Sequence, residues 1–298
     1  MREDYRRMVA VILCTYEPSH FLCEQIDSIL AQIDVNVEIF VFDDGSVSPK
    51  SKEILETIKC KVSKVYHCSP SKSAGKNFIR ALSDFDISRF DYIALSDQDD
   101  LWLNDKLIRA VNCLAVTGAQ GYSSNLIVYD GKDEIGVLSK SVQQSDYDHH
   151  FQGASAGCTY VLTKRLVEII QRDLKKYNFM EHKKSFSHDW LIYFIARTND
   201  VRWYMDNEAK ILYRQHGSNV YGAKRGLFKK FTMVFGDWYS DNIFFISMYR
   251  NCLLDKFDVN CTFFEKLSFF PEILTFRREK VNSMVCYFFW LFKYKSKW

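Results

Sequence analysis

The stretch "MVAVILCTYEPSHFLCEQIDSILAQ", residues 8–32, decides the fold class. Its first part, residues 8–16, is a continuous apolar run, which is typical of a strand buried on both faces. Apolar residues then recur at helical spacing, at Phe21, Leu22, Ile26, Ile29 and Leu30. A buried strand followed directly by an amphipathic helix predicts an α/β protein.

The same unit repeats along the first half of the chain. Further strands are predicted over 37–46, 61–68 and 91–97, and helices over 48–58, 73–85 and 104–116. Ser48 and Asn104 are the expected N-caps, and Pro49 suits a first helical position. This alternation predicts a mostly parallel sheet with helices on both faces, and ligands at the carboxyl ends of its strands.

Composition and charge limit the class of protein. The 298 residues are 47% hydrophobic and 26% charged, which indicates a globular chain with a substantial core. Nine cysteines form no CxxC pair, so free, buried thiols in a reducing, cytoplasmic compartment are expected. Residues 1–8 are polar and no apolar run reaches about 18 residues, so we expect neither a secretory signal nor a spanning helix.

The chain divides into two parts near Tyr221. Residues 222–298 contain 13 Lys and Arg against 7 Asp and Glu, a charge of +6, and the first 221 residues therefore carry −3. The second part is rich in aromatic residues and is expected to be a helical C-terminal tail. Its end, "MVCYFFWLFKYKSKW", fits either packing on the first part or attachment to an anionic membrane surface.

Polar clusters follow three of the predicted strands. They are Thr15-Tyr16-Glu17, Asp43-Asp44-Gly45-Ser46 and Asp97-Gln98-Asp99-Asp100. Taken alone, Asp-Gly-Ser could be merely a turn, and Asp99-Asp100 could merely cap a helix that begins near Leu101. Because the carboxyl ends of parallel strands meet at one edge, we expect a single site there. Crowded carboxylates are stable chiefly when a cation, or donors from a ligand, offset their charge, and oxygen ligands suit Mg²⁺ or Mn²⁺ bridging to phosphates.

A set of motifs in order along residues 8–221 resembles the family 2 glycosyltransferases, which have the GT-A nucleotide-sugar-binding fold. The motifs are "VILCTYEP", "FVFDDGSVS", "GKNFIRAL", "LSDQDDLWLNDKL", "GASAGCTYVLTKRL", "SHDWLIYFIA" and "RQHGSN". The set is most similar to bacterial rhamnosyltransferases of O-antigen and capsule synthesis. The resemblance therefore implies a GT-A domain over residues 1–221, followed by the extension 222–298.

The resemblance also implies roles for the acids. Asp97-Gln98-Asp99 matches the family's Asp-x-Asp motif, with Asp97 and Gln98 near the nucleotide sugar and Asp99 as ligand of Mn²⁺ or Mg²⁺. Asp100 would support the loop. His216 matches a family histidine at the metal or diphosphate, although a lone histidine is also often structural.

Other positions match the family's nucleotide site. Asp44 would accept a hydrogen bond from the pyrimidine, and Ser71-Lys72-Ser73 replaces the Asn and Gly often found before the next helix. Counterparts of Lys76, Asn77 and Arg80 lie near the nucleotide, whereas a solvated helix face is the alternative. Arg214 and Arg225 fit either the diphosphate or the surface. The remaining nucleotide-binding matches are Thr15, Tyr16 and Glu17.

Two later motifs concern the sugar and the acceptor. Gly153 and Gly157 suit a close approach of the backbone to a sugar or a bulge, and Gly157 matches a residue lining the donor sugar. His149 and His150 are expected on a solvated loop. By sequence context, Ser187 or Asp189 is expected to cap the helix that follows, whereas the resemblance makes Asp189 the general base.

The implied reaction is an inverting transfer of rhamnose from dTDP-rhamnose, or of a hexose from UDP-galactose or UDP-glucose. A lipid-linked oligosaccharide at the inner face of the plasma membrane would be the acceptor. A non-catalytic nucleotide-sugar-binding relative is the alternative of another class. An aspartate-based phosphatase is disfavoured by Leu101-Trp102 after the acids, and no nucleic-acid-binding module is present.

Overall fold

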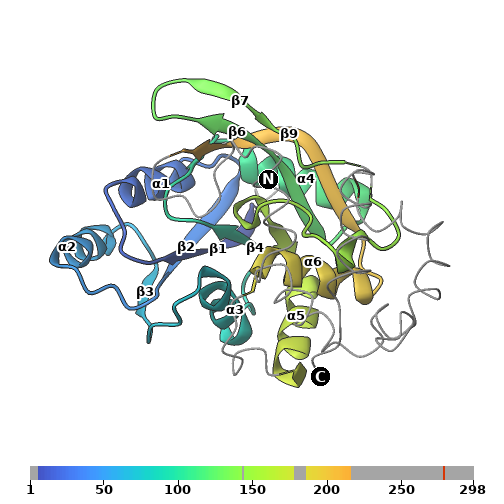
Figure 1. Ribbon diagram of the computed structural model, residues 1–298, viewed down its shortest axis with the longest axis horizontal. Coiled ribbons are helices and arrows are strands. Elements are labelled where there is room, and N and C mark those ends of the chain that lie inside the picture. The colour runs from blue at the N-terminus through green and yellow to red at the C-terminus, as the bar shows by residue number, and fades with distance from the viewer. Residues whose placement is uncertain (1–5, 143, 178–185, 216–277, 279–298) are drawn as a thin grey trace, which may run out of the picture.

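A computed structural model describes residues 6–142, 144–177, 186–215 and 278 (Figure 1). Its strands are β1 (Arg7–Thr15), β2 (Val35–Asp43), β3 (Lys64–His67), β4 (Tyr92–Ser96), β5 (Leu101–Trp102), β6 (Gly121–Tyr129), β7 (Glu134–Leu138), β8 (Val161–Thr163) and β9 (Trp203–Arg214). The helices are α1 (Phe21–Leu30), α2 (Pro49–Ile58), α3 (Ala74–Asp84), α4 (Lys106–Thr117), α5 (Lys164–Tyr177) and α6 (His188–Thr198), with 3-10 turns at Asp148–His150 and Gly157–Thr159.

The strands form one mixed sheet in the order β3-β2-β1-β4-β8-β6-β9-β5, and β7 pairs with β6. The pairings among β3, β2, β1 and β4 are parallel, as is that of β6 with β9. The short strand β8 is antiparallel to β4 and β6, and β5 and β7 also pair antiparallel. The expected mostly parallel sheet is therefore correct for β1 to β4. The later strands add the parallel pairing of β6 with β9 and the antiparallel pairings of β5, β7 and β8, so the described sheet is mixed.

Helices cover both faces of the sheet, as predicted. In β1, Val9, Val11 and Leu13 pack in one cluster with α1, α2 and α4, whereas Ala10, Ile12 and Cys14 pack in another with α3, α5 and α6. The alternation of side chains along a strand produces this division. It buries β1 from Val9 to Thr15, and the polar side chains lie at the carboxyl ends of the central strands.

Most predicted elements are present, with local differences. Ser48 caps α2 through a hydrogen bond from Ser51 N to its side chain. The residue before α4 is Asp105 rather than Asn104, and its side chain makes no cap bond. No helix begins near Leu101, because residues 101–102 pair with β9 as β5.

The predicted boundary at Tyr221 and the helical tail lie outside the described residues, except that Arg278 is placed. Among the described helices, none is long and apolar enough to cross a membrane. The six described cysteines are free, and of these only Cys14 and Cys158 are buried.

Candidate active site

The loops after β1, β2 and β4 meet at one edge of the sheet, as expected. Asp44 N donates to Thr15 O at 2.9 Å, which joins the ends of β1 and β2. Gln98 joins β4 to β1, because its Oε1 accepts from the Thr15 hydroxyl and from Tyr16 N at 3.0 Å, while its Nε2 donates to Tyr16 O at 3.2 Å. Gln98 therefore fixes the two loops relative to each other.

Asp97, Asp100 and Cys158 form a compact group beneath these loops. One ligand atom from each lies within 4.8 Å of the others, and Asp100 and Cys158 are buried. Oδ2 of Asp100 has no hydrogen-bond partner although it is buried. Two carboxylates with an unpaired buried oxygen fit a cation, and carboxylate oxygens are the ligands that Mg²⁺ and Mn²⁺ prefer.

The charges in this group disfavour full ionisation. Burial, and then the charges of Asp99 and Asp189, raise the pKa of Asp97 to about 7. Burial and the neighbouring Asp97 and Asp99 raise the pKa of Asp100 well above its usual range. A cation held among these acids would reverse both effects by favouring the ionised forms.

Asp99 lies outside the compact group of three, although its charge acts on two of them. Its carbonyl accepts from Arg214 Nε at 3.1 Å, and Asp100 Oδ1 accepts from Arg214 N at 3.3 Å. Arg214 is 5% exposed and also pairs with Glu24 at 2.6 Å. Arg214 is therefore buried beside the acidic loop, so of its two expected places, beside the diphosphate or on the solvated surface, the surface is wrong.

Asp44 is buried and already has three donors. Ser71 N and its hydroxyl donate to the two carboxylate oxygens at 2.7 and 2.9 Å, and Arg80 Nη2 donates at 2.9 Å. Lys72, between these contacts and α3, has a φ of 58°, the left-handed conformation that Gly and Asn adopt most readily. Ser71, where the sequence departs from the family pattern, therefore donates two hydrogen bonds to Asp44.

Glu17 and Asn77 bind protein groups in the structure. The Glu17 carboxylate accepts from Val47 N at 2.7 Å, Ser48 N at 3.2 Å and the Ser51 hydroxyl at 2.7 Å. These bonds, that of Val47 N most of all, lower the pKa of Glu17 to about 2. Asn77 is buried, with its Nδ2 donating to Phe42 O at 2.9 Å. Both side chains hold the loops around the site.

Tyr16 and Lys76 leave their side chains nearer to solvent. The Tyr16 side chain is 57% exposed at the end of β1, and Lys76 is partly exposed in the first turn of α3. These two therefore remain accessible to a ligand at this edge.

Asp189 lies in the first turn of α6, as predicted. Its Oδ1 accepts from Trp190 N at 2.8 Å and from the Ser187 hydroxyl. Burial raises its pKa to about 6, against the lowering effects of the Trp190 N–H and of Lys140. Its charge contributes to the raised pKa of Asp97, so the first turn of α6 lies near the loop after β4.

Gly157 and Gly153 permit a close backbone approach, but to α6. A Cβ on Gly157 would lie 2.2 Å from His188 Nε2, and one on Gly153 would lie 3.2 Å from Trp190 N. The His188 ring stacks on Phe78 at 4.0 Å between centroids. The glycines therefore place the first turn of α6 against the loop that carries Cys158.

Several expectations need correction or lie outside the description. His149 and His150 are 8% and 5% exposed, so the prediction of a solvated loop is wrong; the loop packs on α6. His216 and Arg225 lie outside the described residues. Arg80 is neither simply solvated nor free, because it pairs with Asp44.

Sequence reasoning missed Lys106 beneath the acids. Its side chain is completely buried, with Nζ 3.3 Å from the centre of the Trp102 ring and no hydrogen-bond partner. Burial lowers its pKa to about 7, against the effects of Cys158 and Asp100. The i, i+4 spacing of Trp102 and Lys106 is the one sequence signal, and it does not reveal burial.

The fold and the site define the GT-A class of α/β proteins. A solved structure of S. aureus TarS 1-349 in complex with UDP-GlcNAc has the same fold, with a TM-score of 0.57 at 15% identity over 91% of this chain and 74% of that one. The family model Glycosyl transferase family 2 matches residues 10–158. The chain belongs to this family and is a glycosyltransferase.

Two sequence relatives give context. The dTDP-rhamnosyl transferase RfbG of Shigella flexneri is 35% identical over 256 residues, which cover 83% of this chain and 86% of RfbG. The UDP-Glc:alpha-D-GlcNAc-diphosphoundecaprenol beta-1,3-glucosyltransferase WfgD of Escherichia coli is 23% identical over 163 residues, 55% of this chain and 62% of WfgD.

Proposed function

We propose that this protein is an inverting rhamnosyltransferase that transfers rhamnose from dTDP-rhamnose to a hydroxyl of a lipid-linked oligosaccharide in bacterial surface polysaccharide synthesis. The observation that carries the chemistry is the meeting of Asp97, after β4, with Asp189, at the start of α6, in one site. The likeness to RfbG supports the donor, and the name of WfgD supports a lipid diphosphate acceptor.

Asp189 is the general base in this proposal. It accepts the proton of the acceptor hydroxyl while the oxygen attacks the anomeric carbon and the bond to the nucleoside diphosphate breaks. A pKa of about 6 leaves the carboxylate mostly ionised near neutral pH and basic enough to accept a proton. One direct displacement inverts the anomeric configuration and leaves no sugar on the protein.

The acidic group fits a divalent cation, because its carboxylates raise one another's pKa and the buried Oδ2 of Asp100 has no hydrogen-bond partner. We assign Asp99 as principal ligand with Asp97 beside it, and His216 as a second ligand of Mn²⁺ or Mg²⁺. When bound, the ion stabilises the departing diphosphate as a Lewis acid. The Asp100 carboxylate holds the loop through Arg214 N.

The nucleotide lies along the joined strand ends in this proposal. Asp44 retains acceptor capacity for a pyrimidine N–H, because a carboxylate accepts about four hydrogen bonds and three are made. Tyr16 and Lys76 face the base and the phosphates, and Gly157 lies below the sugar. The other proposed contacts are Thr15, Glu17, Asn77 and Gln98, whose described bonds also fix the loops.

The test is transfer from a panel of labelled donors to a lipid-linked acceptor, with the Asp189→Asn variant alongside. We expect turnover with dTDP-rhamnose, an inverted product, and a kcat that is about 10²- to 10⁴-fold lower in the variant at nearly unchanged donor affinity. Asp86→Asn, at an exposed loop, is the matched control. A product of retained configuration would refute the mechanism.

A UDP-hexose donor such as UDP-glucose or UDP-galactose is the alternative, favoured by WfgD. Turnover with a UDP-sugar alone would replace the donor and leave the role of Asp189 standing. Binding of every donor without turnover would instead identify a non-catalytic nucleotide-sugar-binding protein.

A further inference from the structure

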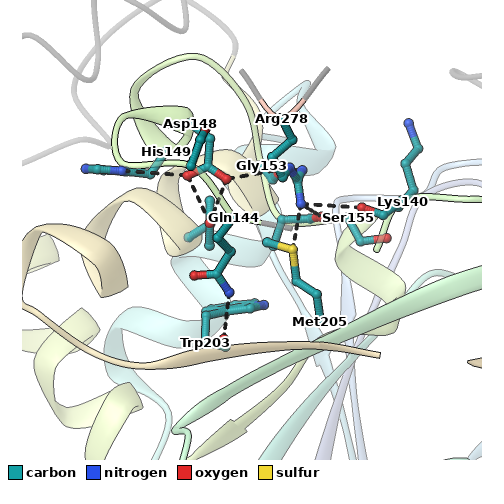
Figure 2. A network of polar contacts seen from close by, with 12 residues as sticks. Lys140, Gln144, Asp148, His149, Gly153, Ser155, Trp203, Met205 and Arg278 are labelled. Atoms are coloured by element: carbon teal, nitrogen blue, oxygen red, sulfur yellow. Dashed lines mark hydrogen bonds and ion pairs between the residues drawn. The ribbon is translucent and has the colours of Figure 1, made fainter. Parts of the chain in front are cut away.

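Arg278 connects the C-terminal part of the chain to the glycosyltransferase domain (Figure 2). Its side chain is 7% exposed, and its Nε lies 3.6 Å from Asp148 Oδ2. Its Nη2 donates to Gly153 O at 2.5 Å, and its Nη1 donates to Ala154 O at 2.8 Å. Nη1 also lies 3.4 Å from Lys140 O and 2.7 Å from Met205 Sδ. One guanidinium thus contacts the chain between Lys140 and Ala154 at several points and also reaches Met205 of β9.

Fixed acceptor groups of the domain surround the Arg278 guanidinium. Asp148 is completely buried, and its carboxylate also accepts from the Tyr193 hydroxyl at 3.0 and 3.1 Å and from Arg197 Nη1 at 3.0 Å. A guanidinium that donates several hydrogen bonds to fixed, buried acceptors binds more strongly than a surface ion pair. Removal of one partner of a buried pair lowers stability, because the other partner is left buried without its bonds. The contact of Arg278 therefore differs in kind from the exposed pairs of this protein.

The loop 148–155, which accepts the Arg278 hydrogen bonds, packs directly against the first turn of α6, which carries Asp189. Ala154 N donates to the Tyr160 hydroxyl at 3.0 Å, and this hydroxyl in turn donates to Asp189 O at 3.2 Å. On the same loop, His149 O accepts from Trp190 Nε1 at 2.8 Å. Arg278 therefore binds a short loop that contacts Trp190 directly and Asp189 O through the Tyr160 hydroxyl.

We propose that Arg278 is a positioning residue that fixes the loop 148–155 against α6 and so sets the place of Asp189 relative to the donor. Arg278 acts through the loop and touches no reacting atom. Its kinetic consequence rests on the proposed function, because it requires Asp189 to be the base. Docking of Arg278 on the loop does not depend on that function.

Docking is tested first, without substrates, by amide hydrogen exchange on the full-length protein. In Arg278→Gln we expect exchange to rise about tenfold or more in the peptides over 148–156 and 188–196, because a fixing contact of the loop is lost. Arg202→Gln is the matched control, since Arg202 donates to Thr117 O at 2.6 Å on the exposed surface. Unchanged exchange in both peptides would overturn the proposal.

Positioning is tested by kinetics. In Arg278→Gln we expect kcat to fall about 10- to 100-fold while the donor dissociation constant changes less than about twofold, because misplacement affects the transition state more than donor binding. Arg278→Lys keeps the charge beside Asp148 but lacks the fork, so its kcat should lie between those of wild type and Arg278→Gln. This variant also serves both experiments if Arg278→Gln does not fold.

The outcomes separate the alternatives. A lower melting temperature with wild-type kcat in both variants would make Arg278 a structural clamp only and overturn the positioning role. A wild-type protein that transfers no sugar would overturn the proposed function together with the kinetic consequence. Hydrogen exchange would still decide whether Arg278 docks.

Discussion

Asp97 illustrates how single residues in this protein carry more than one constraint. It ends a buried strand, it belongs to a compact group with Asp100 and Cys158, and its pKa is raised to about 7 by burial, Asp99 and Asp189. A crowded, partly protonated acid of this kind is costly for a fold, and the proposed cation-binding site for a diphosphate would give it and the two further acids a role.

At the residue scale, the pKa of Asp189 predicts a pH dependence. Burial raises this pKa to about 6, and a general base acts only when ionised, so kcat should fall about tenfold per unit as pH drops below about 6. The expected profile is a rise through pH 6 and a plateau above it. Asp189→Asn should lose this limb, and Asp86→Asn should keep it. An unchanged limb in Asp189→Asn would assign the ionisation to another group.

Metal removal is the second prediction at this scale. An excess of chelator should abolish transfer, and readdition of Mn²⁺ or Mg²⁺ should restore it, because the acids otherwise repel the diphosphate. Asp99→Ala should reduce kcat/KM by at least about 100-fold while the melting temperature changes little. Glu56→Ala, on an exposed face of α2, is the control. Full wild-type activity in chelator would contradict the proposed metal dependence.

At the scale of elements, the packing of α6 on the 3-10 turn at Gly157 is the critical contact. In Gly157→Ala the new Cβ would lie 2.2 Å from His188 Nε2, so α6 or the ring must move. We expect a loss of about 1–3 kcal/mol in the free energy of unfolding, together with reduced kcat, because Asp189 follows His188. Urea unfolding and steady-state kinetics measure the two effects.

The control is the double variant. His188→Ala removes the ring that the Cβ would meet, so Gly157→Ala should cost much less in that background, and the two changes should be non-additive. Additive losses of stability would show that the ring does not create the constraint.

Elements with strong periodicity could be predicted from the sequence, whereas their pairing in space could not. The apolar run of β1 and the spacing of α1 predict both elements within one or two residues at each end. β5 and β8 have two and three residues, too few for a periodic signal, and their antiparallel pairing makes the sheet mixed.

The same limit applies to side chains. The strand ends were predicted to meet, because parallel topology requires it. The partners of Gln98 and Glu17 lie about 30 to 80 positions away, so their hydrogen bonds depend on loop geometry that no local pattern encodes. Burial of His149 and His150 likewise follows from the packing of α6 on their loop.

At the scale of the whole molecule, the two parts of the chain differ in charge, with −3 over residues 1–221 and +6 over 222–298. A long-range field of this kind orients a protein toward an anionic surface with its basic part first. The lipid-linked acceptor that we propose would lie at such a surface. The charge division therefore fits the proposal that the enzyme meets its acceptor at a membrane while the donor enters from solution.

The last prediction is binding of the full-length protein to anionic vesicles. We expect it to cosediment with vesicles that contain phosphatidylglycerol but not with pure phosphatidylcholine, and to dissociate at high salt. A triple change of Lys293, Lys295 and Lys297 to Gln should weaken binding about 100-fold, since each Lys near the surface contributes about 1 kcal/mol. The same change at Lys50, Lys52 and Lys59, exposed in and beside α2, removes equal charge and should have little effect. Equal losses in the two triple variants would show a response to net charge alone, and absence of wild-type binding would exclude peripheral attachment through this segment.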